Sequence, residues 1–364
     1  MPVYISPQAT DAPVIAFIEQ ARGDLTISNY FVDDGGIMRA ISLRVQRNPE
    51  WRTTVIVEPR PYGMGQTEVA REFGALQQTG ATIERSPGRF ATGRVFDHAK
   101  FAVAANEALI GTANWSDSAF RRNREYIYVT QNQATVAFLE SLAASDASGG
   151  QVDPAGPPPS SDGETLVVSP YPDTEQRLAG VIDQPGPVGV ETEEMAPGNP
   201  LMRTLASKGA DAYLILPASD NGRQQQAVAQ LEQAGVHVRE IREPYMHAKV
   251  ICGDRETFLG SQNFSTTSLT ENREVGIILA DGRPSTRAII QQFKADWSAA
   301  SAPGAVATQE SAPGWGGQHK EWGGYQGGYH GGGGEEAYRT YEDVRHADRI
   351  AHDLMRSRHH YSGY

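Results

Sequence analysis

The sequence predicts an α/β fold built from two similar lobes, each a sheet with flanking helices, in a pseudo-two-fold arrangement. Two observations lead to this prediction. Strand-like and helix-like segments alternate in the same order twice, and a Pro-rich stretch separates the two series. The length of 364 residues also leaves room for two domains of ordinary size.

The first series begins with alternating or continuous apolar residues that indicate strands, followed by apolar residues at helical spacing. In order, it comprises a strand at 24–31, a helix at 37–45, a strand at 53–59 and a helix at 68–80. The second series repeats this order with a strand at 187–195, a helix at 201–207, a strand at 211–217 and a helix at 224–235.

Each half closes with an apolar strand and an amphipathic helix, at 125–130 and 134–144 in the first half and at 274–280 and 286–297 in the second. We therefore expect one repeat at residues 1–143, a Pro/Ser/Gly linker at 144–163 and a second repeat at 164–300.

Beyond residue 300 the composition changes. The last 64 residues hold six of the nine histidines and 13 of the 38 glycines. We expect a disordered Gly-rich C-terminal tail with a flexible linker at 301–334, because aliphatic residues are too few there to offset the entropy of folding. Helical spacing at 335–358 predicts an amphipathic helix that docks on the body, binds a partner or lies on a membrane surface.

Composition narrows the class of protein. Asp and Glu number 44 against 32 for Lys and Arg, which is opposite to the broad basic field of a protein that coats nucleic acid. The single cysteine, Cys252, makes neither an internal disulfide nor a thiolate zinc site. No signal-like start and no apolar run of about 18 residues is evident, so we expect a cytoplasmic protein without a transmembrane segment, at most peripheral at a membrane.

A chemical motif occurs once in each half. The segments 98–125 and 247–274 agree without gaps at ten of 28 positions. The shared residues are His98/His247, Ala99/Ala248, Lys100/Lys249, Glu107/Glu256, Gly111/Gly260, Asn114/Asn263, Ser116/Ser265, Asn123/Asn272, Arg124/Arg273 and Glu125/Glu274. One H-x-K would carry little information, but two copies followed at equal distances by G-[ST]-x-N-x-S and N-R-E predict paired chemistry.

The spacing of the motif suggests its use. His and Lys two residues apart on a strand project to one face, so an imidazole can act at an electrophile while an ammonium neutralises an adjacent anion. Two such halves would bring two imidazoles and two ammoniums to an active site at the lobe interface, which suits displacement at phosphorus.

The later parts of the motif predict supporting contacts. The G-[ST]-x-N turn lets the backbone approach a ligand and directs hydroxyl and amide groups at phosphoryl oxygens, which makes Thr112, Ser261, Asn114 and Asn263 candidates for that role. Glu125 and Glu274 are candidates to accept the second ring N–H of each histidine; the alternative is a salt bridge to a neighbouring arginine.

These paired motifs resemble the signature of the phospholipase D superfamily, a duplicated H-x-K-x4-D followed by G-[ST]-x-N. The resemblance covers residues 1 to about 300. The second half carries the signature in full, with Asp254 at the acidic position, whereas Ala105 stands there in the first half. In the family this Asp is regarded as structural, so the departure concerns local stability more than catalysis.

The resemblance implies a phosphodiesterase that needs neither metal nor other cofactor and works through a covalent phosphohistidine. It implies that His98 is the nucleophile, that His247 is the general acid and then base, and that Lys100, Lys249, Asn114 and Asn263 bind the phosphate. A site completed within one chain also suggests a monomer.

An insertion in the first half adds candidates for substrate binding. From the helix-ending glycine to the histidine there are six more positions in the first half than in the second, and this segment contains Arg89 and Arg94. We expect this loop to border the site and to help select an anionic substrate.

Three functions remain open from the sequence. The leading one is hydrolysis or transfer of phosphatidyl groups of glycerophospholipids at a membrane surface. The second is a metal-independent nuclease of the same superfamily, with nucleic acid as the substrate. The third is a catalytically silent binding module, against which the intact motifs in both halves count.

Overall fold

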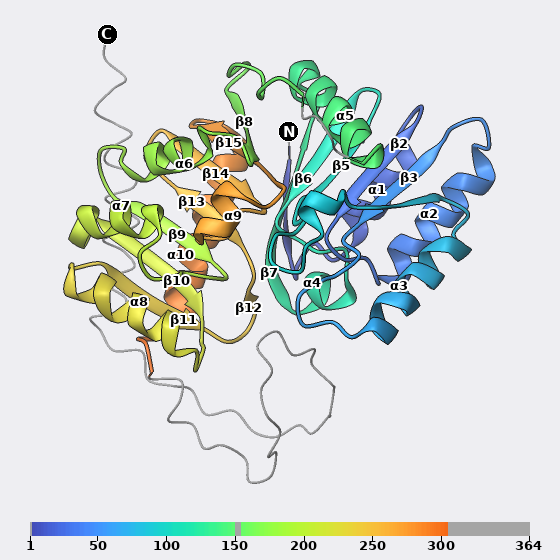
Figure 1. Cartoon of the computed structure of the whole chain (residues 1–364). Coiled ribbons are helices and arrows are strands. Elements are labelled where there is room, and N and C mark those ends of the chain that lie inside the picture. Colours follow the sequence, from blue (N-terminus) through green and yellow to red (C-terminus); the bar gives the residue numbers. More distant parts are fainter. Residues whose placement is uncertain (1, 150–153, 305–364) are drawn as a thin grey trace.

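The computed structural model describes residues 2–149 and 154–304, which form two lobes lying side by side (Figure 1). Each lobe contains one mixed β-sheet with helices packed against it, so the predicted α/β class and the two similar lobes are confirmed. Except for residues 301–304, the expected tail linker lies outside the described residues, as does the expected helix at 335–358.

The first lobe contains seven of the strands and five α-helices in the described ranges. Its strands are β1 (Val3–Ser6), β2 (Leu25–Asn29), β3 (Thr53–Val57), β4 (Thr82–Arg85), β5 (Lys100–Ala104), β6 (Glu107–Gly111) and β7 (Asn123–Thr130). Its helices are α1 (Ala12–Gln20), α2 (Gly35–Arg47), α3 (Gln66–Gln78), α4 (Asp117–Arg121) and α5 (Gln133–Ala147), with a 3₁₀ turn η1 (Gly88–Phe90).

The second lobe repeats this series. Its strands are β8 (Glu164–Ser169), β9 (Val188–Thr192), β10 (Ala212–Pro217), β11 (His237–Ile241), β13 (Lys249–Cys252), β14 (Glu256–Gly260) and β15 (Glu274–Ala280), and the short β12 (Tyr245–Met246) joins the other sheet. Its helices are α6 (Thr174–Ile182), α7 (Pro200–Lys208), α8 (Gly222–Gln233), α9 (Thr266–Thr270) and α10 (Pro284–Ala299), with a 3₁₀ turn η2 (Gly209–Asp211).

The two sheets have the same strand order. The first runs β1-β7-β6-β5-β2-β3-β4, and the second runs β8-β15-β14-β13-β9-β10-β11 when read from the equivalent edge. In both, the strand that begins at the lysine of H-x-K pairs antiparallel with the first strand of a parallel trio: β5 with β2, and β13 with β9. Each lobe begins with a strand and a helix, β1-α1 and β8-α6, that precede the predicted series.

Local sequence explains where the equivalent helices start. Asp34 precedes α2, and its side chain accepts a hydrogen bond from the backbone N–H of Ile37. Asn199 precedes α7 and accepts one from Met202, and Pro200 occupies the first turn. Such caps satisfy backbone donors that a helix start leaves unpaired.

The lobes share one hydrophobic core. A cluster of buried side chains includes residues of both sheets together with α5 and α10, for example Phe101 and Tyr128 of the first sheet, Val250 of the second, and Phe293 and Trp297 of α10. Helices α1–α4 and α6–α9 cover separate clusters on the other faces. Because the interface is part of the core, side chains from the two lobes are held in fixed register.

The predicted linker starts too early. Helix α5 runs to Ala147, so residues 144–147 of the expected linker are helical, and β8 begins at Glu164. The reason is tertiary: Asp146, in the last turn of α5, is fully buried and pairs with Arg273 of the second lobe. The helix therefore extends far enough to deliver that carboxylate to the interface.

Candidate active site

Each histidine of the repeated motif reaches the opposite lobe. The residues just before His247, in β12, pair in parallel with the start of β7, so that Met246 lies beside Arg124. In the same way Asp97 bridges to Arg273, and the backbone N–H of His98 donates to the carbonyl of Arg273. Each histidine consequently lies next to the glutamate that ends the N-R-E motif of the other half.

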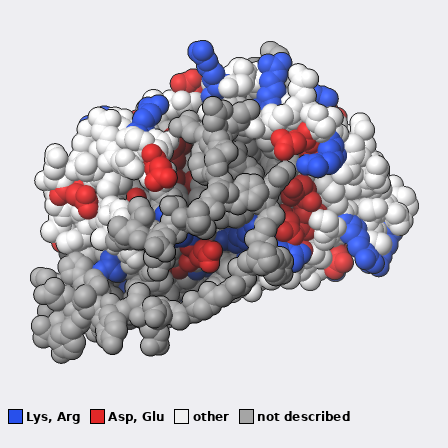
Figure 2. Space-filling view, turned by 90° about the horizontal axis from the view of Figure 1, so that it is seen from below, with Lys and Arg blue, Asp and Glu red and all other residues white. Residues whose placement is uncertain are grey.

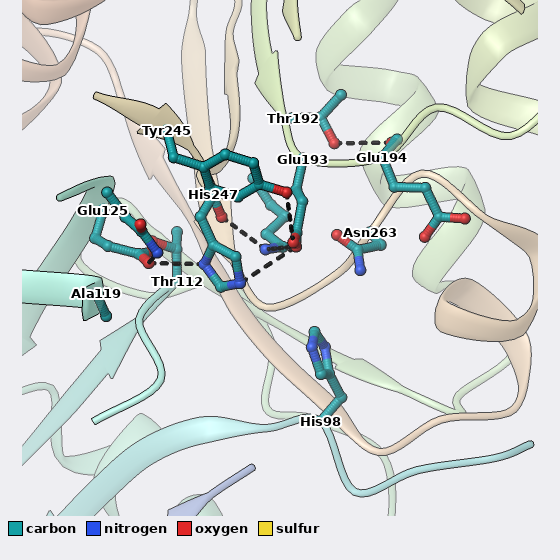
Figure 3. Close-up of polar contacts among 12 residues, drawn as sticks. His98, Thr112, Ala119, Glu125, Thr192, Glu193, Glu194, Tyr245, His247 and Asn263 are labelled. Atoms are coloured by element: carbon teal, nitrogen blue, oxygen red, sulfur yellow. Dashed lines mark hydrogen bonds and ion pairs between the residues drawn. The ribbon is translucent and has the colours of Figure 1, made fainter. Parts of the chain in front are cut away.

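The two imidazoles contact these glutamates crosswise. Nδ1 of His98 lies 2.9 Å from Oε2 of Glu274, within hydrogen-bond geometry. Nδ1 of His247 lies 2.7 Å from Oε1 of Glu125, although at an angle poorly suited to a hydrogen bond (Figure 3). In both cases Nδ1 faces a carboxylate, which leaves Nε2 as the nitrogen available for chemistry.

The glutamates are themselves held in place. Glu125 accepts hydrogen bonds from the hydroxyl of Thr112 (2.5 Å) and the amide of Asn123 (3.2 Å). Glu274 accepts them from the hydroxyl of Ser268 (2.6 Å) and the amide of Asn272 (3.2 Å). Both carboxylates are fully buried, so these bonds compensate for lost water and fix their orientation.

Both lysines of the motif are completely buried beside the histidines. Nζ of Lys100 donates to the carbonyl of His98 at 2.8 Å, and Nζ of Lys249 donates to the carbonyl of His247 at 2.6 Å. Burial lowers the pKa of Lys100 to about 7, and the charge of Lys249 acts in the same direction across the interface. The two ammonium groups therefore belong to one site.

The histidines are electrostatically different. Burial lowers the pKa of His98 from its usual value, and Glu274 only partly opposes this, so His98 is neutral at pH 7. His247 has a carboxylate at each nitrogen: Glu125 at Nδ1 and, 3.3 Å from Nε2, Oε2 of Glu193. Two carboxylates therefore face the His247 ring, although its Nδ1 makes no hydrogen bond to Glu125.

The two asparagines of the turns present unpaired groups. The amide oxygens of Asn114 and Asn263 are buried and have no hydrogen-bond partner within residues 2–149 and 154–304. Figure 3 shows the Asn263 amide on the side of the site where Glu193 and His98 lie. Since buried polar groups are nearly always paired, equivalent unpaired amides in both halves indicate positions that a ligand completes.

Comparisons with known proteins identify the family of this chain. A family model described as "Cardiolipin synthase, PLD-like domain" matches residues 14–146 and 198–297, more than half of the chain. The chain belongs to the phospholipase D superfamily. A search of curated proteins found no significant match.

Solved structures of very different sequence share the superfamily fold. Phosphatidylserine synthase from Haemophilus influenzae Rd KW20 matches with a TM-score of 0.61 and 12% identity, over 80% of this chain and 85% of that one. Polyphosphate kinase from Porphyromonas gingivalis matches with a TM-score of 0.57 and 16% identity, over 80% of this chain. The chain spans about half of that kinase, 49% of its length.

Two residues expected to bind substrate make other contacts in this superfamily member. The hydroxyl of Thr112 is buried and donates a hydrogen bond to Glu125, and it also accepts one from the backbone N–H of Tyr126. The hydroxyl of Ser261 is buried, accepts from Val275 and interacts with Glu274. Both hydroxyls therefore contact the carboxylates in this structure, and their binding of a phosphoryl group stays a prediction.

The inserted loop lies on the second lobe, and its two arginines are exposed. Phe96 in this loop donates its backbone N–H to Asn272, and Phe90 is buried in η1. The guanidinium of Arg89 lies over the ring of Phe90, 4.3 Å from its centroid. The structure does not bring Arg89 or Arg94 into contact with the histidines, and their role in substrate selection stays a prediction.

Glu193 is the residue that sequence reasoning missed. It follows β9 and is buried between Lys249 and His247, with 2.7 Å between its Oε2 and Nζ of Lys249. A repeat comparison does not reveal it, because the equivalent position in the first half is Tyr30. The signal available was its place near the carboxyl end of a predicted strand, where functional side chains of α/β folds gather.

Within the described ranges, no group of three or more His, Cys, Asp and Glu side chains is arranged to hold a metal ion. In those same ranges no helix is long and apolar enough to cross a bilayer.

Proposed function

We propose that the protein is a phosphodiesterase that hydrolyses or transfers the phosphatidyl groups of glycerophospholipids through a phosphohistidine intermediate. The observation that carries this proposal is the crosswise pairing of His98 with Glu274 and of His247 with Glu125. It leaves two reactive Nε2 atoms beside two buried ammonium groups, which is what in-line displacement at a phosphodiester requires.

In the first step, His98 is the nucleophile. Its Nε2 lone pair forms a bond to phosphorus while the bond from phosphorus to the leaving alcohol oxygen breaks. The proton on Nε2 of His247 passes to that oxygen, so the alcohol leaves neutral. Burial favours the neutral form of His98, and the carboxylates of Glu125 and Glu193 face His247, the residue that supplies the proton in this scheme.

In the second step, the roles of acid and base reverse. Nε2 of His247, now without its proton, removes a proton from water or an acceptor alcohol as that oxygen attacks phosphorus. The P–N bond breaks and its electron pair returns to His98, which regenerates the starting state. General acid–base catalysis of this kind contributes roughly 10²- to 10⁴-fold to the rate.

The negative charge of the phosphoryl group is balanced by Lys100 and Lys249, each of which retains an N–H not used on the backbone. The side-chain N–H groups of Asn114 and Asn263 complete the clamp by donating to phosphoryl oxygens, and their unpaired amide oxygens are acceptors for a donor group of the ligand. No step in this scheme calls for a metal or another cofactor, and all its groups come from one chain, in keeping with a monomer.

Lipid is favoured over nucleic acid as substrate for two reasons. The matching family model carries the description of a cardiolipin synthase domain, and one protein of the same fold is a phosphatidylserine synthase. In addition, Asp and Glu side chains lie among the Lys and Arg side chains wherever the described residues are visible in Figure 2. Nucleic-acid binding depends on an excess of basic side chains.

The decisive assay compares three substrates under metal-free conditions with chelator present: phosphatidylcholine vesicles, phosphatidylglycerol vesicles and single-stranded DNA. Wild type should release the lipid headgroup, and His98→Ala should not. The control is His237→Ala, which removes a half-buried histidine that stacks on Tyr213 in the second lobe and should leave turnover intact.

Each other outcome favours a different function. Cleavage of DNA alone by the wild type would support the nuclease, and turnover of none of the three substrates would support a silent binding module. Lipid turnover that survives His98→Ala would contradict the mechanism.

A further inference from the structure

The pseudo-two-fold symmetry of the site is broken by a pair of residues, Tyr30 and Glu193. Each directly follows the strand whose last residue pairs with a motif lysine: Asn29 lies opposite Lys100, and Thr192 lies opposite Lys249. Equivalent backbone positions therefore carry an aromatic ring in one half and a carboxylate in the other.

The two side chains occupy equivalent places and differ in charge. The ring of Tyr30 meets the His98 ring edge-on, with 4.9 Å between centroids, and lies 5.2 Å from Nζ of Lys100. Glu193 instead contacts Nζ of Lys249 and Nε2 of His247. Burial opposes ionisation of Glu193, but the charges of His247 and Lys249 outweigh it and lower its pKa, so it is a carboxylate.

Glu193 is adjacent to the position of the alcohol that leaves or attacks. In the proposed mechanism, that oxygen exchanges a proton with Nε2 of His247 and must approach within hydrogen-bond distance of it. Oε2 of Glu193 lies 3.3 Å from the same nitrogen. Substituents one or two carbons from the alcohol oxygen therefore come near the carboxylate.

The charges of the site's own groups nearly cancel, so no positive excess is left for a whole phosphodiester. In the proposed mechanism Lys100, Lys249 and the acid His247 carry positive charge, and the carboxylates of Glu125, Glu274 and Glu193 equal them in number. The carboxyl of Glu194 lies on the same side of the site as Asn263 (Figure 3). Burial raises the pKa of this carboxyl, and the charge of Glu193 raises it further. A phosphodiester would add a further negative charge.

We propose that Glu193 selects phosphodiesters whose alcohol carries an ammonium group, that is, amino-alcohol esters such as those of ethanolamine or choline. The ammonium would pair with Glu193 and contact the ring of Tyr245, which is 41% exposed and whose hydroxyl lies 3.4 Å from Oε1 of Glu193. This inference rests on the proposed function and names the substrate class of the same site.

The test measures a ratio of specificities. Phosphatidylethanolamine and phosphatidylglycerol are presented at low mole fraction in neutral detergent micelles, and kcat/KM is determined for both headgroups. We expect the wild type to prefer ethanolamine, and Glu193→Gln to reduce that preference by roughly tenfold, the scale of one partly buried charge pair. The matched control is Glu140→Gln, which removes an exposed carboxylate from α5 and should leave the ratio unchanged.

A purely structural role for Glu193 would lower both values of kcat/KM equally and leave their ratio intact, which would overturn the inference. A wild-type preference for the glycerol headgroup would overturn it as well. Hydrolysis of bis(p-nitrophenyl) phosphate, which has no ammonium, separates the two proposals: its absence in the wild type would contradict the phosphodiesterase activity itself.

Discussion

At the scale of single residues, the chemistry depends on which nitrogen of each imidazole is free. Nδ1 of both histidines faces a glutamate from the other half, and the surroundings of Nε2 then differ. Nε2 of His247 faces Glu193, whereas Nε2 of His98 makes no hydrogen bond in the described part of the chain. The symmetric sequence motif thus becomes an asymmetric pair, with a nucleophile and an acid.

Glu274→Gln tests the carboxylate behind the nucleophile. Glutamine lacks the negative charge and can turn its NH2 group towards Nδ1 of His98, so the tautomer with a free lone pair on Nε2 is less favoured. We expect kcat to fall by about 100-fold with little change in KM. Steady-state kinetics check this, with circular dichroism to establish that the variant is folded; an unchanged kcat would mean that Glu274 does not orient His98.

The titration of Lys100 should determine how kcat/KM changes at alkaline pH. Because burial lowers its pKa to about 7, the ammonium is present below that pH and is lost as pH rises through it, together with its charge on the phosphate. The value of kcat/KM, which reports the free enzyme, should therefore decline above about pH 7. On the acid side it should decline where His98 becomes protonated, below the ordinary histidine range, since the pKa of His98 is lowered.

Lys100→Arg distinguishes this explanation from a general loss of stability. Arginine stays charged throughout the range, so the alkaline decline should move upward by more than one pH unit even if the maximal rate is lower. A decline that stays at the same pH would assign it to another group.

At the scale of elements, the N-R-E segment joins the lobes. Its Asn holds the glutamate, its Glu faces the opposite histidine, and its Arg pairs with an aspartate of the opposite helix: Arg124 with Asp296 of α10, and Arg273 with Asp146 of α5. The Arg273 pair is bidentate at 2.9 and 3.0 Å and has no exposed surface. One short segment therefore fixes both the interface and the site.

Arg273→Ala should destabilise the protein strongly, since it leaves Asp146 buried without its partner. We expect a loss of about 3–5 kcal/mol in the free energy of unfolding, measured by denaturant titration. The control is Arg121→Ala, which breaks an exposed pair with Asp117 and should change stability by less than about 1 kcal/mol. Equal losses in the two variants would show that the buried pair does not hold the lobes.

At the scale of the whole molecule, repetition made much of the fold accessible from sequence. The two series of strands and helices follow the predicted order because periodic apolar residues and turn signals are local. The paired His, Lys and Asn positions were likewise visible, since the same spacing occurs twice. The edge strands β1 and β8 and their helices were missed because they precede the segments in which the repeat is evident.

What could not be predicted depends on contacts between the lobes. The sequence does not show that each glutamate serves the histidine of the other half, or that Arg124 and Arg273 pair with distant aspartates in place of their neighbouring glutamates. Glu193 was missed for the opposite reason: it is where the two halves differ, and a search for repeated residues passes over it. The pairing of each histidine with the glutamate of the other half is therefore a property of the folded molecule.

The central claim, a covalent intermediate on His98 completed by His247, is tested most directly by trapping that intermediate. With bis(p-nitrophenyl) phosphate the leaving group needs no acid, so His247→Ala should form the phosphoenzyme and then stall for lack of a base. It should release about one equivalent of nitrophenolate per site in a burst and carry an acid-labile phosphoryl group, and His98→Ala should show neither. A burst and label in His98→Ala but not in His247→Ala would contradict the assignment.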